Sequence, residues 1–422
     1  MRPARAAAVD TAGWGTGALE EGARVDVARL RAQRRAAVLA AMAADDLDAL
    51  VLGREANARY VSGARRLWTE GPRPFGPGCV VLAATDEIHL LSTWDDGIPA
   101  EIDHDHLYGV TWNGATLFGA LAAIDGLTGA RRIGVDGMSP GMGQMLGALA
   151  PGAEVVDASG LLGAVRRTKS PDELACIGTS LAIAEAALAD AMASLAPGVT
   201  GRELAGRVAA RLAELGVTTP DFEATFTSSS PVRGPAGRGR RGEGLSVGDD
   251  PPLRILPTPE AFGGGALVTG QVGGLYMGYE GLVARTWICP TASGDAAPTP
   301  DQQRLHRRWL GLSERLEAAC RPGAAAGGLL GAYQAAGEPV PANVLVAQGV
   351  GLGMERPLVG TQVPPDAGAT TTLEPGMVLY VTAAVTDRRV GTELAGQTVL
   401  VTDAGPQVLS RHSFGPLAGD AG

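Results

Sequence analysis

The feature that most constrains the fold is a helix-start signal at residue 170. Ser170 can cap a first helical turn, Pro171 suits the first helical position, and Glu173 stands three residues after the serine, as a capping box requires. The Ala- and Leu-rich segment that follows predicts a long helix ending near Pro197-Gly198. We therefore expect one structural region before this helix and a second region that begins with it.

The residues before this helix alternate between helical and strand patterns. Residues 27–47 have a helical pattern, and a second, Ala-rich helix is expected at 116–127. Short apolar runs predict strands, and they lie at 48–53, 78–84, 87–92, 130–137 and 153–159. The sequence therefore predicts an N-terminal α/β domain over residues 26–160, preceded by a flexible tail at 1–25.

The part of the chain from residue 161 to 415 predicts an α+β domain. Thr200 and Glu203 form another capping-box pattern that opens a second helix, and strands and further helices follow. Residues 231–252 are rich in Gly, Pro and Arg and have no periodicity, which predicts a loop. The arginines of this loop either contact an anionic substrate or only solvate the loop.

Charge and cysteine usage limit the partners and the location. The formal net charge is −10 and the pI about 5.1, and no extended basic face is visible, which argues against nucleic acid. The cysteines form no CxxC pair, as expected for reduced thiols; they are Cys79, Cys176, Cys289 and Cys320. No signal peptide or run of ~20 apolar residues is seen, so we expect a cytoplasmic protein that does not enter a membrane.

Five motifs together resemble the creatinase/Xaa-Pro peptidase superfamily. They are RRTKSPDE, GYEGLVART, QGVGLGMERP, LEPGMVLYV and TVLVTDAG, in that order, and the resemblance covers residues 26–412. The resemblance implies a small N-terminal α/β domain followed by a pita-bread domain, a curved antiparallel sheet covered by helices. It also implies a homodimer, in which the N-terminal domain of one subunit leans over the active site of the other.

Peptidases of this superfamily bind two divalent metal ions through two Asp, one His and two Glu. Matched motif by motif, these positions carry other residues here: Gln271, Leu282, Gln348, Thr382 and Gly396. Shifting the match to reach the nearest acids, such as Glu280 or Glu355, breaks the flanking motifs. We therefore expect neither the metal pair nor any other cofactor. His104-Asp105-His106 is metal-like in isolation, but we interpret it as a polar turn or strand alternation.

Two further positions that hold substrate-handling histidines in the superfamily fall on Arg254 and Glu355. The resemblance thus implies Glu355 as a catalytic acid or base and Arg254 as a catalytic anchor for an anionic group. The substrate-binding set predicted around them comprises Gln271, Gln348, Thr382, Tyr279, Arg285, Tyr380 and Trp68.

Three functions remain open at this point. The first is a metal-independent, creatinase-like enzyme that acts on a small polar, anionic substrate by acid-base catalysis, through hydrolysis or elimination at a C–N bond. A biosynthetic pathway would suit such a rebuilt site. The second is an inactive binding or regulatory module in which Glu355 and Arg254 only pair with each other. The third is a residual Xaa-Pro dipeptidase.

Overall fold

A computed structural model describes residues 25–64, 78–91, 97–109, 111, 113–217, 221–229, 260–342, 344–353, 355–364, 366 and 368–412. The chain divides into two compact units, and the boundary lies between Arg167 and Thr168. The predicted loop at 231–252, the predicted tail up to residue 24, and two predicted site residues, Trp68 and Arg254, lie outside the described residues.

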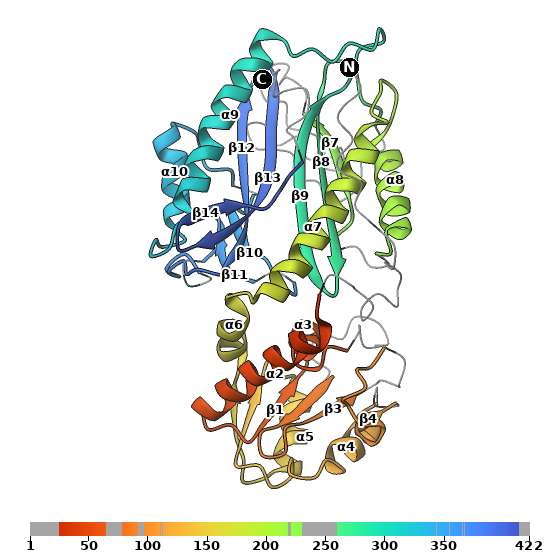
Figure 1. Ribbon diagram of the computed structural model, residues 1–422, viewed down its shortest axis with the longest axis vertical. Helices are drawn as coiled ribbons and strands as arrows, with labels where there is room; N and C mark the ends of the chain where they lie inside the picture. The colour runs from red at the N-terminus through yellow and green to blue at the C-terminus, as the bar shows by residue number, and fades with distance from the viewer. Residues whose placement is uncertain are drawn as a thin grey trace. The chain divides into compact units, whose positions relative to one another are not determined.

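The N-terminal unit is an α/β domain (Figure 1). Its described strands form a six-stranded sheet in the order β4-β3-β2-β1-β5-β6. The strands are β1 (Ala49–Leu52), β2 (Cys79–Leu82), β3 (Glu87–Leu91), β4 (Leu107–Tyr108), β5 (Arg132–Val135) and β6 (Glu154–Asp157). The described helices are α2 (Val27–Ala44), α3 (Glu55–Ser62), α4 (Gly114–Ala122), α5 (Pro140–Leu149) and α6 (Ser159–Arg167), and the 3-10 turn η1 spans His104–His106.

Pairing in this sheet is mixed, and its core is apolar. β1 runs antiparallel to β2 and parallel to β5, while β3 runs parallel to the edge strand β4. Buried aliphatic side chains from β1, β2 and β5 pack against α4 and α5. The unit includes α6 and so ends at Arg167, beyond the boundary at residue 160 that the sequence pattern suggested.

The C-terminal unit has a large antiparallel sheet (Figure 1). Eight strands are described, in the order β11-β10-β12-β13-β9-β8-β7, with β14 also paired to β13. They are β7 (Thr225–Ser229), β8 (Leu267–Tyr276), β9 (Tyr279–Ile288), β10 (Ala347–Gly349), β11 (Glu355–Val359), β12 (Val378–Asp387), β13 (Gly391–Thr402) and β14 (Gly405–Val408). The helices are α7 (Pro171–Met192), α8 (Gly201–Glu214), α9 (Pro300–Ala319) and α10 (Gly328–Ala336).

The helix α7 begins with the capping box that the sequence predicts. The Ser170 hydroxyl accepts from the Glu173 amide, and the Glu173 carboxylate accepts from the Ser170 amide. Sequence reading identified no segment suited to a membrane, yet α7 is long and apolar enough to cross one. It packs on β8 and β9 and most of its apolar stretch is buried there, as in the core helix of a globular domain.

Helix α9 packs against strand β12, which belongs to the same C-terminal unit. Trp309 is fully buried and donates its indole N–H to the carbonyl of Ala383 at 3.0 Å. Leu379 and Val381 of β12 and Val399 of β13 join the core beneath α9. Because side chains alternate along a strand, the residues between them face the opposite side of the sheet.

Candidate functional site

The positions matched to the family's metal ligands meet at the centre of the large sheet. Thr382 pairs with Gly396, Gly396 with Ala284, and Ala284 with Gln271, so one row crosses β12, β13, β9 and β8. Leu282 lies two residues along β9 from this row. Gln348 of β10 pairs with Tyr380, which lies two residues from Thr382.

These side chains share the face of the sheet that is turned away from α9, which we name the site face. On β12 and β13 the core beneath α9 takes Leu379, Val381 and Val399, so Tyr380, Thr382 and position 396 point the other way. Directly paired residues lie on one side of a sheet, which puts Ala284 and Gln271 on the site face too. Gln271 and Gln348 are partly buried, and Thr382 is buried.

The site face does not fit the dinuclear metal centre of the family. The five positions offer two amides, one hydroxyl and, at Leu282 and Gly396, no donor at all. Ala284, Ala384, Leu394 and Val344 form an apolar cluster with Tyr380 packed against it. A metal pair needs carboxylates to balance its charge, so these residues could not hold it.

The ring of Tyr380 takes the space next to Gly396. A Cβ atom added at Gly396 would overlap the hydroxyl and ring carbons of Tyr380. Burial also raises the pKa of the Tyr380 phenol, so the hydroxyl stays protonated and can donate a hydrogen bond. Tyr380 therefore lies on the site face, and it fills the volume of the side chain that position 396 lacks.

Glu355 lies in a buried ion pair with Lys169. Lys169 Nζ is 2.6 Å from Glu355 Oε2, and the two side chains are 2% and 9% exposed. The other carboxylate oxygen accepts from the Leu352 amide at 3.3 Å. The sequence interpretation paired Glu355 with Arg254 only in the binding-module alternative, and it missed Lys169, although this lysine stands in the RRTKSPDE motif directly before the helix cap.

A pair of acids, Asp221 and Glu280, also lies close to Gly351. Glu280 is buried and hydrogen-bonded to Asp221, and its carboxylate is 3.4 Å from the Gly351 amide. Burial raises the pKa of Asp221 from an ordinary 3.8 to about 6. A hydrogen bond between two carboxyl groups requires a proton on one of them, so this pair retains a proton to a higher pH than an exposed acid would.

Gly351 is close to both the Lys169–Glu355 pair and the Asp221–Glu280 pair. A Cβ atom at Gly351 would overlap the Glu355 carboxylate, so a glycine is needed for that carboxylate to lie there. Glu280 stands two residues before Leu282 on β9, and strand alternation therefore puts it on the site face. Asp221, Glu280, Glu355 and Lys169 are named the acid cluster below. The two-residue spacing from Leu282 could have identified Glu280 from the sequence.

Two predicted substrate-binding residues point away from the site face. Tyr279 is 1% exposed and donates its hydroxyl to Glu173 at 2.8 Å, at the start of α7. Arg285 is equally buried and donates to the carbonyls of Ala284, Gly396 and His412. Both alternate with the residues of β9 that lie on the site face, so their contacts hold the sheet, α7 and the C-terminal segment together.

Comparison with known proteins identifies both units. The model of metallopeptidase family M24 matches residues 175–403, and that of the creatinase/prolidase N-terminal domain matches residues 34–168. No curated protein matches the sequence at a significant level.

Solved structures share the fold at low identity. The Xaa-Pro dipeptidase from Bacillus anthracis is 18% identical, with a TM-score of 0.67 over 91% of this chain and 98% of its own. The prolidase from Pyrococcus horikoshii is 18% identical, with a TM-score of 0.66 over 90% and 98%. The X-Pro aminopeptidase from Thermotoga maritima is 15% identical, with a TM-score of 0.66 over 88% and 98%.

The predicted fold, an α/β domain followed by a pita-bread domain, is thus confirmed. The chain belongs to metallopeptidase family M24, a family of hydrolases, and carries a creatinase/prolidase N-terminal domain.

Proposed function

We propose that this chain is a metal-independent hydrolase or lyase that acts on a small polar, anionic substrate at a C–N bond. The observation that carries the proposal is the acid cluster, which borders the site face where the family's metal ligands are replaced. In the proposed enzyme, carboxyl groups do the proton transfers. A biosynthetic role, a cytoplasmic location and a homodimer complete the proposal.

The two pairs of the acid cluster suit different steps. Glu355 forms an ion pair with Lys169 and so supplies a charged carboxylate that can accept a proton. The Asp221–Glu280 pair retains a proton and can donate it to a leaving nitrogen. Gln271, Gln348 and Thr382 offer neutral hydrogen-bonding groups that can orient a polar substrate.

The test begins with turnover of candidate substrates. Purified protein in EDTA is incubated with small guanidino, ureido and N-acyl carboxylic acids, and their loss is followed by proton NMR. We expect consumption of one class, and a fall of about 10²- to 10⁴-fold in kcat for Glu355→Gln. Asp403→Asn, in the exposed turn after β13, is the matched control and should keep the wild-type rate. An unchanged rate for Glu355→Gln would remove this residue from the mechanism.

A non-catalytic binding protein is the second candidate, and a specific contact favours it. Both oxygens of Glu355 already accept hydrogen bonds or an ion pair, from Leu352 and Lys169. If ligands from the panel raise the melting temperature but none is consumed, the binding module is supported and the enzyme is not. Hydrolysis of Xaa-Pro dipeptides that appears with Mn²⁺ and disappears in EDTA would instead support the residual dipeptidase.

A further inference from the structure

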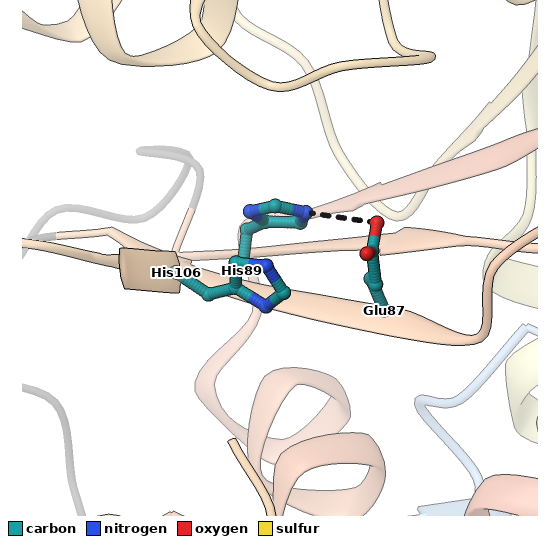
Figure 2. Close-up of side chains that lie close together, drawn as sticks. All are labelled: Glu87, His89 and His106. Atoms are coloured by element: carbon teal, nitrogen blue, oxygen red, sulfur yellow. Dashed lines mark ion pairs between the residues drawn. The ribbon is translucent and has the colours of Figure 1, made fainter. Parts of the chain in front are cut away.

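Three ligand-type side chains meet at the edge of the N-terminal sheet. Glu87 and His89 are two residues apart on β3, so they lie on one face of the strand. The parallel pairing of Leu90 with Leu107 continues backward and brings His106 beside His89. One carboxylate oxygen and one nitrogen from each imidazole all lie within 4.8 Å of one another (Figure 2).

His89 has a buried nitrogen without a hydrogen-bond partner. Its side chain is 6% exposed, and Nε2 makes no hydrogen bond. Glu87 Oε2 lies 3.9 Å from Nε2, which is too far for a hydrogen bond. A buried polar atom without a hydrogen bond lowers the stability of the folded state, so its presence here requires an explanation. Figure 2 shows this nitrogen directed toward the Glu87 carboxylate, with the His106 ring alongside.

The other nitrogen of His89 is already held. Nδ1 lies 3.4 Å from the Tyr108 hydroxyl, and the His89 and His106 rings are 4.1 Å apart between centroids. Metal-binding histidines commonly use their second nitrogen for such a contact, which fixes the direction of the first.

We propose that Glu87, His89 and His106 bind one divalent transition-metal ion, with Zn²⁺ the best match. Two imidazoles and one carboxylate are a ligand set that zinc takes readily, and a fourth position stays open to water or a small ligand. Tetrahedral bonds of about 2.1 Å separate ligands by roughly 3.4 Å. Glu87 and His106 are only partly buried and can move inward by that margin, while His89 is fixed.

Such an ion would join the 3-10 turn η1 to strand β3. β4 is the edge strand and pairs with β3 through only two residues, Leu107 and Tyr108. A metal bridge from His89 to His106 stabilises this short edge, because binding to the folded state alone raises its stability. The site lies in the N-terminal unit and does not depend on the function proposed for the acid cluster.

The turn itself supplies the control for the test. His104 belongs to the same His-Asp-His sequence, is exposed, and is not among the three clustered side chains. The full-length protein and its variants are freed of metal with EDTA and titrated with Zn²⁺ by calorimetry. We expect one ion per chain for wild type and for His104→Ala. Loss of an outer contact costs roughly 10- to 100-fold in affinity, so His106→Ala and Glu87→Gln should lose more than about 100-fold.

Two further readouts locate the ion. Co²⁺ in place of Zn²⁺ should give the intense visible bands of a tetrahedral site in wild type and none in His106→Ala. Tyr108→Phe should weaken binding roughly 10- to 100-fold and retain those bands, because the hydroxyl only orients His89. Equal affinity of the His104→Ala and His106→Ala variants, or no binding by wild type, would overturn the proposal. Glu355→Gln should leave Zn²⁺ binding unchanged, which separates this site from the acid cluster.

Discussion

Gly396 and Tyr380 show how a side chain can take over the volume of a lost ligand. Gly396 lies in the middle of β13, where a glycine offers nothing to pack, and the Tyr380 ring crosses from β12 to fill that space. The ring also joins the apolar cluster of Ala284, Ala384 and Leu394. Packing thus explains why the loss at position 396 leaves no void in the sheet.

A glutamate returned to position 396 should destabilise the fold. Gly396→Glu must displace the Tyr380 ring, and overpacking of this kind typically costs about 1–3 kcal/mol. Urea unfolding should show a lower midpoint for this variant than for wild type. The double variant with Tyr380→Ala should recover part of the difference, since the ring is then absent. Equal midpoints for Gly396→Glu and wild type would contradict the placement of the ring.

Asp221 predicts a specific dependence of stability on pH. Its pKa is raised from 3.8 to about 6 in the folded protein, so the folded state holds the proton more tightly than the unfolded state. The wild type therefore loses stability as pH rises from about 4 through 6. Asp221→Asn lacks this loss, and its stability relative to wild type should increase over that window.

Urea unfolding at several pH values between 4 and 7 measures this difference. Asp403→Asn, in an exposed turn, is the control and should follow wild type throughout. A constant difference between Asp221→Asn and wild type at every pH would show that burial does not raise the pKa of Asp221 in the folded protein.

At the scale of elements, α7 is fixed to the sheet through its first turn. Glu173 is buried, accepts from the Ser170 amide within the capping box, and accepts from the Tyr279 hydroxyl of β9. The helix start and the strand start are thus joined through one carboxylate. The capping box is local and follows from the letters Ser-Pro-Asp-Glu, but the Tyr279 contact spans more than a hundred residues and has no local signal.

The link between the Tyr279 contact and the helix cap can be measured as an interaction free energy between two substitutions. Tyr279→Phe leaves an oxygen of buried Glu173 without its donor and should cost about 1–3 kcal/mol in the free energy of unfolding. Ser170→Ala removes the cap and should cost about 1 kcal/mol. Because both act on Glu173, the double variant should differ from the sum of the two. Strict additivity would show that the cap and the tyrosine act independently.

Pairing between strands also explains which site residues sequence reasoning could find. Gln348 was located because it lies inside a motif, and Gln271 and Thr382 because each lies a few residues from one; the register brings the three near one another. Lys169 and Asp221 reach the acid cluster from segments far from Glu355 and Glu280 in the sequence. Tertiary contacts of this kind carry no periodicity. Tyr279 and Arg285 face the helices because of strand alternation relative to Leu282, a pattern that the sequence does contain.

At the scale of the whole molecule, the chain consists of two units, each with its own sheet and core. The fold was predictable because five motifs occur in order between residues 166 and 405, which lie almost entirely in the C-terminal unit, and because helix and strand patterns alternate before them. The chemistry was not, because it depends on what stands at a few sheet positions and on contacts between distant segments. The architecture is the family's, while the residues at the five matched positions of the site face are not its metal ligands.

The effect of metal ions on the melting temperature of the whole protein should come from the N-terminal unit and not from the site face. With the N-terminal cluster disabled by His106→Ala, neither Mn²⁺ nor Co²⁺ should shift the melting temperature, and EDTA should have no effect. The site face retains only two amides and a hydroxyl at the five ligand positions, which cannot hold these ions tightly. Differential scanning calorimetry measures the shift, and a rise with Mn²⁺ in this variant would restore the peptidase interpretation.

The position of the Tyr380 ring bears on the evolutionary history of the site. An acid introduced at position 396 would clash with this ring before any metal ion could bind. Metal binding would therefore require a second change at Tyr380. Four other ligand positions would also have to revert. In the proposed metal-independent enzyme each of these changes therefore depends on the others, and no single substitution would complete the family's ligand set.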